Sequence, residues 1–306
     1  MARKPLFRRR YPKKEAPQPV SLPTSIAWST IAALILLGTI QELGRFRSAL
    51  DTRFGFSCIA VFLVGTIISV GLFISGRRRS GIVPPEKQSR MQERILDGDI
   101  EAWWISVISP VENFLVRKRF NPDHITLLSF GFNAAGCLLF CVGWVFMAGW
   151  AVIFAGTLDV LDGRIARTIG TASKRGAFFD SMLDRYGEIL IFLGLAVHFR
   201  GSILFPVILL ALAGSLMVSY TRARAEGLGV NCRVGMMQRP ERIVLLGFGA
   251  IFSSVLYMLR GPLGMNAGPY LMGLVLVLLA ILANHTAFLR MIHVMRELKK
   301  DKEPPP

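Results

Sequence analysis

The amino-acid sequence predicts an all-α integral membrane protein. Hydrophobic residues make up 52% of the 306 residues, and the mean hydropathy is +0.48, which is high for a soluble globular protein. Several apolar runs approach the roughly 20 residues that a helix needs to cross the hydrocarbon core of a bilayer. The placement of basic residues between these runs agrees with the same class of protein.

We predict about eight membrane spans from the apolar runs. They lie near residues 26–40, 58–75, 125–146, 151–167, 178–198, 203–220, 243–258 and 270–289. The shorter runs need flanking residues to complete a crossing.

The formal net charge is +16, from 36 Lys and Arg against 20 Asp and Glu. With the N-terminus in the cytoplasm, the eight spans leave few basic residues outside: Arg45, Arg47, Arg53, Arg200 and Arg260. Because cytoplasmic segments of membrane proteins are rich in Lys and Arg, both termini are predicted to be cytoplasmic. The basic excess then reflects topology and attraction to anionic lipid headgroups, and no nucleic-acid partner is predicted.

The chain divides into four segments. Residues 1–25 are basic and rich in proline, so they are predicted to form a disordered tail. Two spans and a linker follow over residues 26–85, the main domain covers 86–298, and 299–306 form a second disordered tail. The cysteine spacing favours neither a disulfide nor a zinc site. We interpret the four cysteines as packing residues: Cys58, Cys137, Cys141 and Cys232.

The main domain opens with an amphipathic stretch. Apolar residues that can share one helix face are Trp103, Val107, Val111, Phe114 and Leu115. Such a helix is expected to lie in the interface plane of the membrane. The run Ser109-Pro110-Val111-Glu112 has the pattern of a capping box, which predicts that a helix restarts there.

Four aspartates stand between two apolar segments. Asp159 and Asp162 are three residues apart, and Asp180 and Asp184 are four apart, so each pair occupies one face of its helix. An ionised Asp at membrane depth costs about 2.5–3.5 kcal/mol, so this cluster requires compensating cations. Carboxylates at this density suit Mg²⁺ or Mn²⁺, and two ions about 3.5–4 Å apart would hold a diphosphate for displacement at phosphorus.

Small and basic residues accompany the aspartates. Gly163 and Gly176 carry no Cβ and allow close approach, Ala166 leaves room for a neighbouring helix, and Arg167 offers a planar donor fork for phosphate. The alternative is a structural salt-bridge network between the aspartates and the nearby basic residues Arg164, Arg167, Lys174, Arg175 and Arg185.

The pattern D-x2-D-G-x2-A-R-x8-G-x3-D-x3-D resembles the signature of the CDP-alcohol phosphotransferases. Its fixed positions are met by Asp159, Asp162, Gly163, Ala166, Arg167, Gly176, Asp180 and Asp184. The resemblance covers roughly residues 88–295 and implies a core of six spans preceded by an interfacial helix. The first two predicted spans lie outside this core.

The resemblance also implies roles for these residues. Asp159, Asp162 and Asp180 would ligate two Mg²⁺ or Mn²⁺ ions. Asp184 would contribute to the metal site and act as the general base on an acceptor hydroxyl, which attacks the β-phosphorus of CDP-diacylglycerol and releases CMP. Gly163, Ala166, Arg167 and Gly176 would hold the nucleotide. The family also implies a homodimer and, for this chain, a bacterial inner membrane with a cytoplasmic active site.

Two further segments bear on the acceptor alcohol. Arg222 ends the sixth predicted span and Arg239 opens the seventh, and both resemble positions in phosphatidylinositol phosphate synthases, whose acceptor is inositol phosphate. Lys174 could be a third contact. This favours inositol 1-phosphate, with glycerol 3-phosphate second. The alternative is that these are flanking charges that follow the positive-inside rule, or structural partners of Glu241.

Two other classes remain open. A transporter could use intramembrane carboxylates as an ion path, but its acidic residues should then spread across the membrane depth instead of gathering at one end. A catalytically silent family member could serve as an assembly subunit, although the intact motif argues against it. Asn121 and Thr126 precede or open the third span and could either cap its helix or touch the nucleotide.

Overall fold

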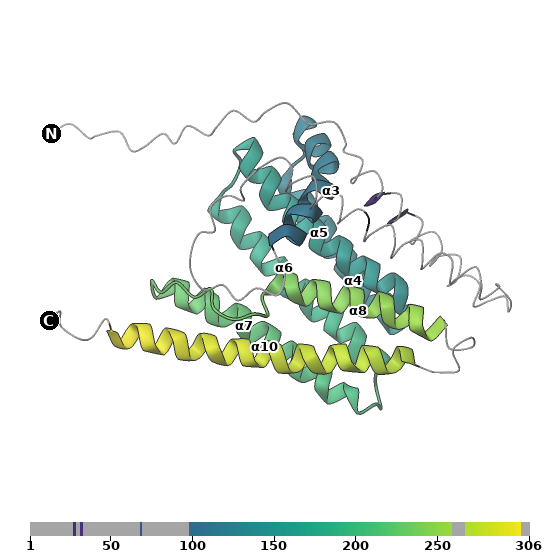
Figure 1. The fold of residues 1–306 in the computed structure, drawn as a ribbon. Helices are drawn as coiled ribbons and strands as arrows, with labels where there is room; N and C mark the ends of the chain where they lie inside the picture. Colours follow the sequence, from purple (N-terminus) through teal and green to yellow (C-terminus); the bar gives the residue numbers. More distant parts are fainter. Residues whose placement is uncertain (1–26, 29–30, 33–67, 69–97, 259–266, 301–306) are drawn as a thin grey trace, which may run out of the picture.

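The computed structural model describes residues 27–28, 31–32, 68, 98–258 and 267–300. These residues are helical or lie in connections, with no strand among them. The long helices are α3 (Gly98–Arg117), α4 (Pro122–Cys141), α5 (Val145–Ile169), α6 (Lys174–His198), α7 (Leu204–Gly227), α8 (Arg239–Met258) and α10 (Ala267–Lys300) (Figure 1). The all-α prediction is therefore confirmed for the described part of the chain.

Five of these helices are long and apolar enough to cross a membrane: α4, α5, α7, α8 and α10. Helix α6 is 25 residues long but carries Asp180 and Asp184 in its first half and Glu188 just past its middle. The predicted spans near 26–40 and 58–75, and the predicted tails and linker, lie almost wholly outside the described residues.

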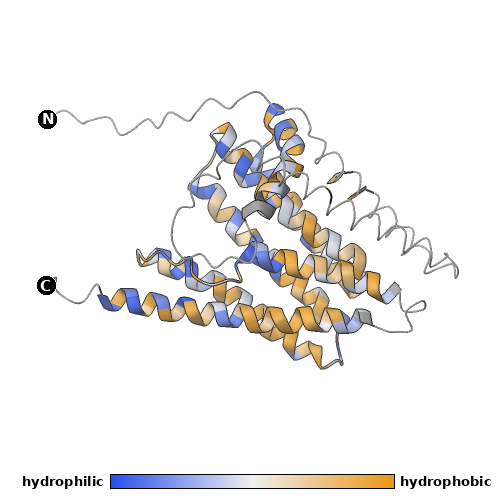
Figure 2. Ribbon diagram, viewed as in Figure 1, coloured by the Kyte–Doolittle hydropathy of each residue, from blue (hydrophilic) through white to orange (hydrophobic). Residues whose placement is uncertain are grey.

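The helices form two interlocked groups. Helix α4 packs between α5 and α6, and α10 packs between α7 and α8, while α5–α8 and α6–α7 contacts join the groups. The central apolar cluster includes Phe140, Leu195, Ile208, Ala250 and Leu276, which are all fully buried. Figure 2 shows apolar residues along most of each helix and hydrophilic residues where α5 meets α6, α7 ends and α8 begins.

Glycine permits the closest of these approaches. A Cβ on Gly194 of α6 would stand 2.5 Å from the backbone oxygen of Cys137 on α4. A Cβ on Gly149 of α5 would stand 2.7 Å from the backbone oxygen of Gly247 on α8. Small residues let helix backbones approach closely in membranes, as they do here.

The predicted helix restart at Ser109 is wrong. Helix α3 runs without a break from Gly98 to Arg117 and contains Pro110. The Ser109 hydroxyl donates to the backbone oxygen of Ser106 at 2.9 Å, so it caps no new helix. Asn121, by contrast, caps α4, because its side chain accepts a hydrogen bond from the Asp123 N–H at 3.0 Å.

Candidate active site

A short turn connects α5 to α6, and because both helices pack against α4, the two aspartate pairs come together. Gly170 ends α5 in the left-handed region at φ 82°, and its N–H donates to the Ala166 oxygen. Ser173 caps α6 and accepts from the Gly176 N–H at 3.1 Å. Gly176 therefore closes the first turn of α6, which explains part of the spacing between the two halves of the motif.

Three of the four aspartates form one cluster. Asp159, Asp162 and Asp180 each present a carboxylate oxygen, and these oxygens lie within 4.8 Å of one another. Asp162 is 3% exposed and accepts a hydrogen bond from the Thr126 hydroxyl at 2.6 Å. Thr126 thus contacts a residue of the aspartate cluster. Its hydroxyl also lies 3.1 Å from the Pro122 oxygen of its own helix.

The donor set of this cluster fits a divalent cation. Asp180 Oδ1 is buried and has no hydrogen-bond partner among the residues that the structure describes. A buried carboxylate oxygen without a partner is costly, and a cation removes that cost. Hard oxygen ligands from closely spaced carboxylates are those that Mg²⁺ and Mn²⁺ prefer.

Asp184 is joined to the cluster through Arg239. The Arg239 guanidinium donates from Nη1 to Asp159 Oδ2 and from Nη2 to Asp184 Oδ1, each at 2.5 Å. Arg185 lies farther from the other oxygen of Asp184, at 3.7 Å. One planar cation from α8 therefore bridges the carboxylates of α5 and α6.

The predicted nucleotide residues line one cleft. Gly163, Ala166, Arg167 and Gly176 surround an open space of about 1150 Å³ beside Asp162 and Asp180. Asn121 and Thr126 line the same cleft. A Cβ on Gly163 would lie 3.4 Å from Arg167 Nη1, so the guanidinium rests over the bare backbone of this glycine.

A second cleft, which Asp184 lines, is basic and holds about 820 Å³ of space that is open to solvent. Its cationic lining comes from α6, α7, α8 and α10: Arg185, Arg222, Arg239, Arg242 and Arg290. The structure thus places Arg222 and Arg239 in the same cleft. Lys174 is exposed at the first residue of α6 and does not line this cleft.

Sequence reasoning missed Arg290 as a member of this lining. Arg290 is 2% exposed and donates to the backbone oxygens of Val218 at 2.7 Å and Val234 at 2.9 Å. Arg290 follows the predicted span 270–289 by one residue, so the sequence indicated only a flanking cytoplasmic charge. Its place in the cleft depends on how α10 packs against α7 and α8.

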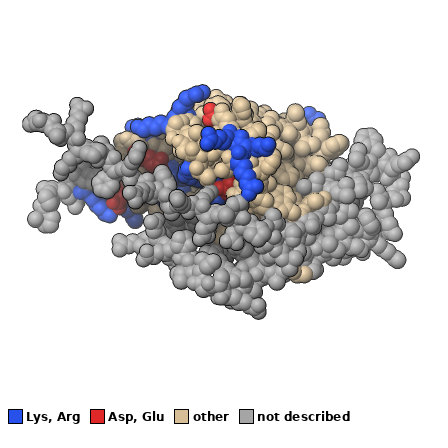
Figure 3. All heavy atoms as spheres, turned by 90° about the horizontal axis from the view of Figure 1, so that it is seen from above, with Lys and Arg blue, Asp and Glu red and all other residues tan. Residues whose placement is uncertain are grey.

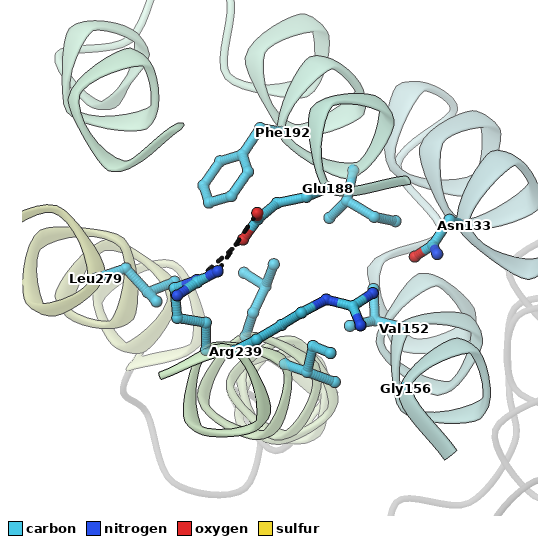
Figure 4. A pocket seen from close by; sticks show the side chains of 11 residues that line it. Asn133, Val152, Gly156, Glu188, Phe192, Arg239 and Leu279 are labelled. Carbon is cyan, nitrogen blue, oxygen red and sulfur yellow. Dashed lines mark hydrogen bonds and ion pairs between the residues drawn. The ribbon is translucent and has the colours of Figure 1, made fainter. Parts of the chain in front are cut away.

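Glu188 and Arg242 were also missed as a pair. Glu188 Oε1 accepts from Arg242 Nε at 2.9 Å and from the Ser215 hydroxyl at 2.5 Å, which ties α6, α7 and α8 together. The two side chains face a small cavity that Arg239 and Asn133 also line (Figure 4). Arg242 is 3% exposed, so it lies inside the protein and not among the lipid headgroups.

Basic side chains also gather on the surface. Figure 3 shows Lys and Arg over part of the described surface, with a few acidic side chains between them. The polar helix ends in Figure 2 and this charge mark the end of the molecule that contains both clefts.

Comparison with known proteins identifies similar chains. Residues 119–283 match the CDP-alcohol phosphatidyltransferase family. A phosphatidylinositol phosphate synthase of Cutibacterium acnes is 35% identical over 149 residues, which are 47% of this chain and 72% of that protein. An archaetidylinositol phosphate synthase of Methanothermobacter thermautotrophicus is 35% identical over 184 residues, 60% of this chain and 87% of that protein.

The fold is also similar to solved structures of a phosphatidylinositol phosphate synthase. The crystal structure of Mycobacterium tuberculosis phosphatidylinositol phosphate synthase with CDP-DAG bound superposes with a TM-score of 0.53 at 30% identity, over 61% of this chain and 93% of that one. The same enzyme in complex with manganese and citrate has a TM-score of 0.53 at 30% identity, over 61% and 88% of the two chains.

Proposed function

The chain belongs to the CDP-alcohol phosphatidyltransferase family, and on that premise we propose that it transfers the phosphatidyl group of CDP-diacylglycerol to inositol 1-phosphate and releases CMP. The family makes it a transferase of phospholipid biosynthesis. The observation that carries the proposal is that Asp184, which lines the arginine cleft, is joined through Arg239 to the aspartate cluster beside the nucleotide cleft.

The basic cleft supports an acceptor that itself carries a phosphate. Arg222, Arg239 and Arg242 supply guanidinium groups of the geometry that binds phosphate oxygens. A neutral acceptor such as serine needs no such lining. The relatives named as phosphatidylinositol phosphate synthases and as an archaetidylinositol phosphate synthase favour inositol 1-phosphate, and glycerol 3-phosphate is the second candidate. Lys174, which lies outside the cleft, is not part of this proposal.

The aspartate cluster supports a site for two Mg²⁺ or Mn²⁺ ions held by Asp159, Asp162 and Asp180, with Asp184 contributing. When bound, the ions would supply positive charge to the diphosphate of the CDP-lipid. Gly163, Ala166, Arg167 and Gly176 would hold the nucleotide, as the lining of the first cleft supports. The manganese complex of the M. tuberculosis enzyme agrees with a divalent cation in this fold.

Asp184 would act as the general base. It takes the proton of the acceptor hydroxyl as that oxygen bonds to the β-phosphorus, and the bond from this phosphorus to the CMP oxygen breaks. Arg239 contacts Asp184 Oδ1, so Oδ2, which lies 3.7 Å from Arg185, would be the oxygen that accepts the proton.

The proposal extends to topology. We infer that α6 also spans the membrane, which gives six core spans, and that two further spans precede α3 to give eight. We also propose that the segments of the chain end at residues 25, 85 and 298 and that the protein forms a homodimer. It would lie in a bacterial inner membrane, with the active site and both termini in the cytoplasm. The gathering of polar helix ends at one end of the molecule supports a single cytoplasmic site.

The test is CMP release by the purified protein with CDP-diacylglycerol, Mg²⁺ and a panel of alcohols. Inositol 1-phosphate should give the highest kcat/KM, and free inositol and serine should give little product. Asp184→Asn should abolish CMP release while CDP-lipid binding persists, and Glu297→Gln, at the exposed end of α10, is the matched control. Fastest turnover with serine would overturn the acceptor assignment, and full activity of Asp184→Asn would overturn the base.

A further inference from the structure

A tryptophan ahead of the family-matched region bonds to the interfacial helix. Trp28 Nε1 donates to the backbone oxygen of Val107 in α3 at 2.8 Å. Both residues precede residue 119, where the match to the family begins. Only Trp28 lies ahead of the family-like region that begins near residue 88, so the contact joins an added segment to the helix that precedes the core.

The bonded carbonyl lies beside a proline within the helix. Pro110 has no N–H, so the Ser106 oxygen lacks its usual intrahelical donor, and the ring disturbs the helix turn before it. The Ser109 hydroxyl donates to that Ser106 oxygen at 2.9 Å. Trp28 donates to the next carbonyl, on Val107. This hydrogen bond stabilises α3 at the turn that lacks the N–H of Pro110.

Apolar packing holds the same segment in place. Ala27 is 2% exposed and Ile31 is 9% exposed, and these two residues are one helical turn apart. They form one apolar cluster with Val107 of α3 and with residues of α5 and α8, namely Phe146, Trp150, Ile153, Ile251 and Val255. The segment is thus seated where three helices meet.

The other side of α3 holds the motif end of α5. Ile108 of α3 packs in a cluster with Leu161 and Ile165. Glu112, 3% exposed, accepts from Arg164 Nε and Nη2, each at 2.8 Å. The residues of α5 that α3 contacts stand at unspecified positions of D-x2-D-G-x2-A-R: Leu161, Arg164 and Ile165. Helix α3 therefore contacts α5 between the fixed residues of the motif.

We propose that Trp28 is a positioning residue for the nucleotide cleft and acts through α3 on the motif end of α5. The inference rests on the proposed function, since it assigns CMP to the cleft of Gly163 and Arg167. That cleft is lined by the start of α4, the C-terminal part of α5 and the first turns of α6, whereas the basic cleft is lined by α6, α7, α8 and α10. A displaced α3 should therefore affect nucleotide binding more than acceptor binding.

The test uses the full chain and Trp28→Phe, which keeps an aromatic ring and removes the N–H donor. CMP binding, measured by calorimetry with Mg²⁺, should weaken by between about twofold and tenfold, the usual net effect of one hydrogen bond. The KM for the CDP-lipid should rise by a similar factor, and the KM for the acceptor should rise less. Tyr270→Phe, which removes a hydroxyl from a side chain 79% exposed on α10, is the matched control.

A double-variant cycle tests the route through α3. If Trp28 acts through the Glu112–Arg164 pair, Trp28→Phe should weaken CMP binding less in a Glu112→Gln background than in the native chain. Additive effects, or a lower melting temperature with unchanged CMP affinity, would reduce Trp28 to a structural residue and overturn the inference. Absence of CMP binding by the native chain would instead overturn the proposed function.

Discussion

Arg239 links the aspartate cluster to the basic cleft. Its guanidinium contacts Asp159 and Asp184 and is 22% exposed. In this position it balances two carboxylates that would otherwise repel each other in a partly buried site. It also lines the basic cleft, so the same group faces two kinds of partner, carboxylates and an acceptor phosphate.

Arg239→Ala is expected to impair acceptor use far more than nucleotide use. The loss of a charge-assisted hydrogen bond is worth about 1.5–3 kcal/mol, so the KM for inositol 1-phosphate should rise by roughly tenfold or more. Steady-state kinetics with each substrate varied in turn measures the effect. Arg200→Ala, at an exposed residue between α6 and α7, is the control. Equal increases in both KM values would contradict the acceptor assignment.

Asp180 should report on the metal site. Because its Oδ1 is buried without a partner among the described residues, Asp180→Asn should weaken Mn²⁺ binding by at least about tenfold. Electron paramagnetic resonance of free Mn²⁺ measures this without any turnover. Chelation of divalent cations should stop CMP release by the native chain, and activity that persists in excess chelator would remove the metal from the proposal.

At the scale of helices, the Glu188–Arg242 pair fixes α8 against α6. Arg242 is buried, and Ser215 of α7 contributes a second hydrogen bond to Glu188. Loss of one partner leaves a largely buried charge unpaired, so Glu188→Leu should lower the free energy of unfolding by about 3–5 kcal/mol.

The comparison for Glu188→Leu is an exposed pair in the same protein. Arg222 and Glu226 also lie 2.9 Å apart, but their side chains are 43% and 52% exposed. Glu226→Gln should therefore change stability by no more than about 1 kcal/mol. Thermal unfolding in detergent measures both variants. Equal shifts in melting temperature would show that the Glu188–Arg242 pair behaves as a surface pair.

Helix approach at Gly194 gives another prediction. An alanine there would place its Cβ against backbone atoms of Cys137, which no side-chain rotation can relieve, so Gly194→Ala should lower the melting temperature by several degrees. Gly131→Ala on α4 is the control, because its Cβ would meet nothing within 4 Å and alanine favours a helix. A more stable Gly194→Ala protein would contradict the observed α4–α6 packing.

At the scale of the whole molecule, the proposed topology predicts which connections face the cytoplasm. In a chain without its native cysteines, Arg200→Cys between α6 and α7 should react with a membrane-impermeant maleimide in intact cells. Leu228→Cys between α7 and α8 should react only after the membrane is made permeable, since that end contains both clefts. The reverse pattern would place the active site outside.

The class of protein, the family and the spacing of the motif residues could be predicted from the amino-acid sequence alone. These follow from local properties: apolar length, and spacings of three or four residues that put Asp159 with Asp162 and Asp180 with Asp184 on one helix face. The turn was also local, because Ser173 and Gly176 close the first turn of α6 by themselves. Ala27, Trp28 and Ile31 were predicted to lie in a membrane span, and nothing in the sequence indicated that they contact α3.

The contacts between side chains that lie far apart in the sequence could be seen only in the folded chain. Arg239 contacts Asp159 across 80 positions of sequence, and Thr126 reaches Asp162 across 36. The structure also showed that α3 continues through Pro110, where a local capping pattern had predicted a break. The physical reason is that spacing fixes the face of one helix, whereas the rotation and offset between two helices depend on packing along their whole length.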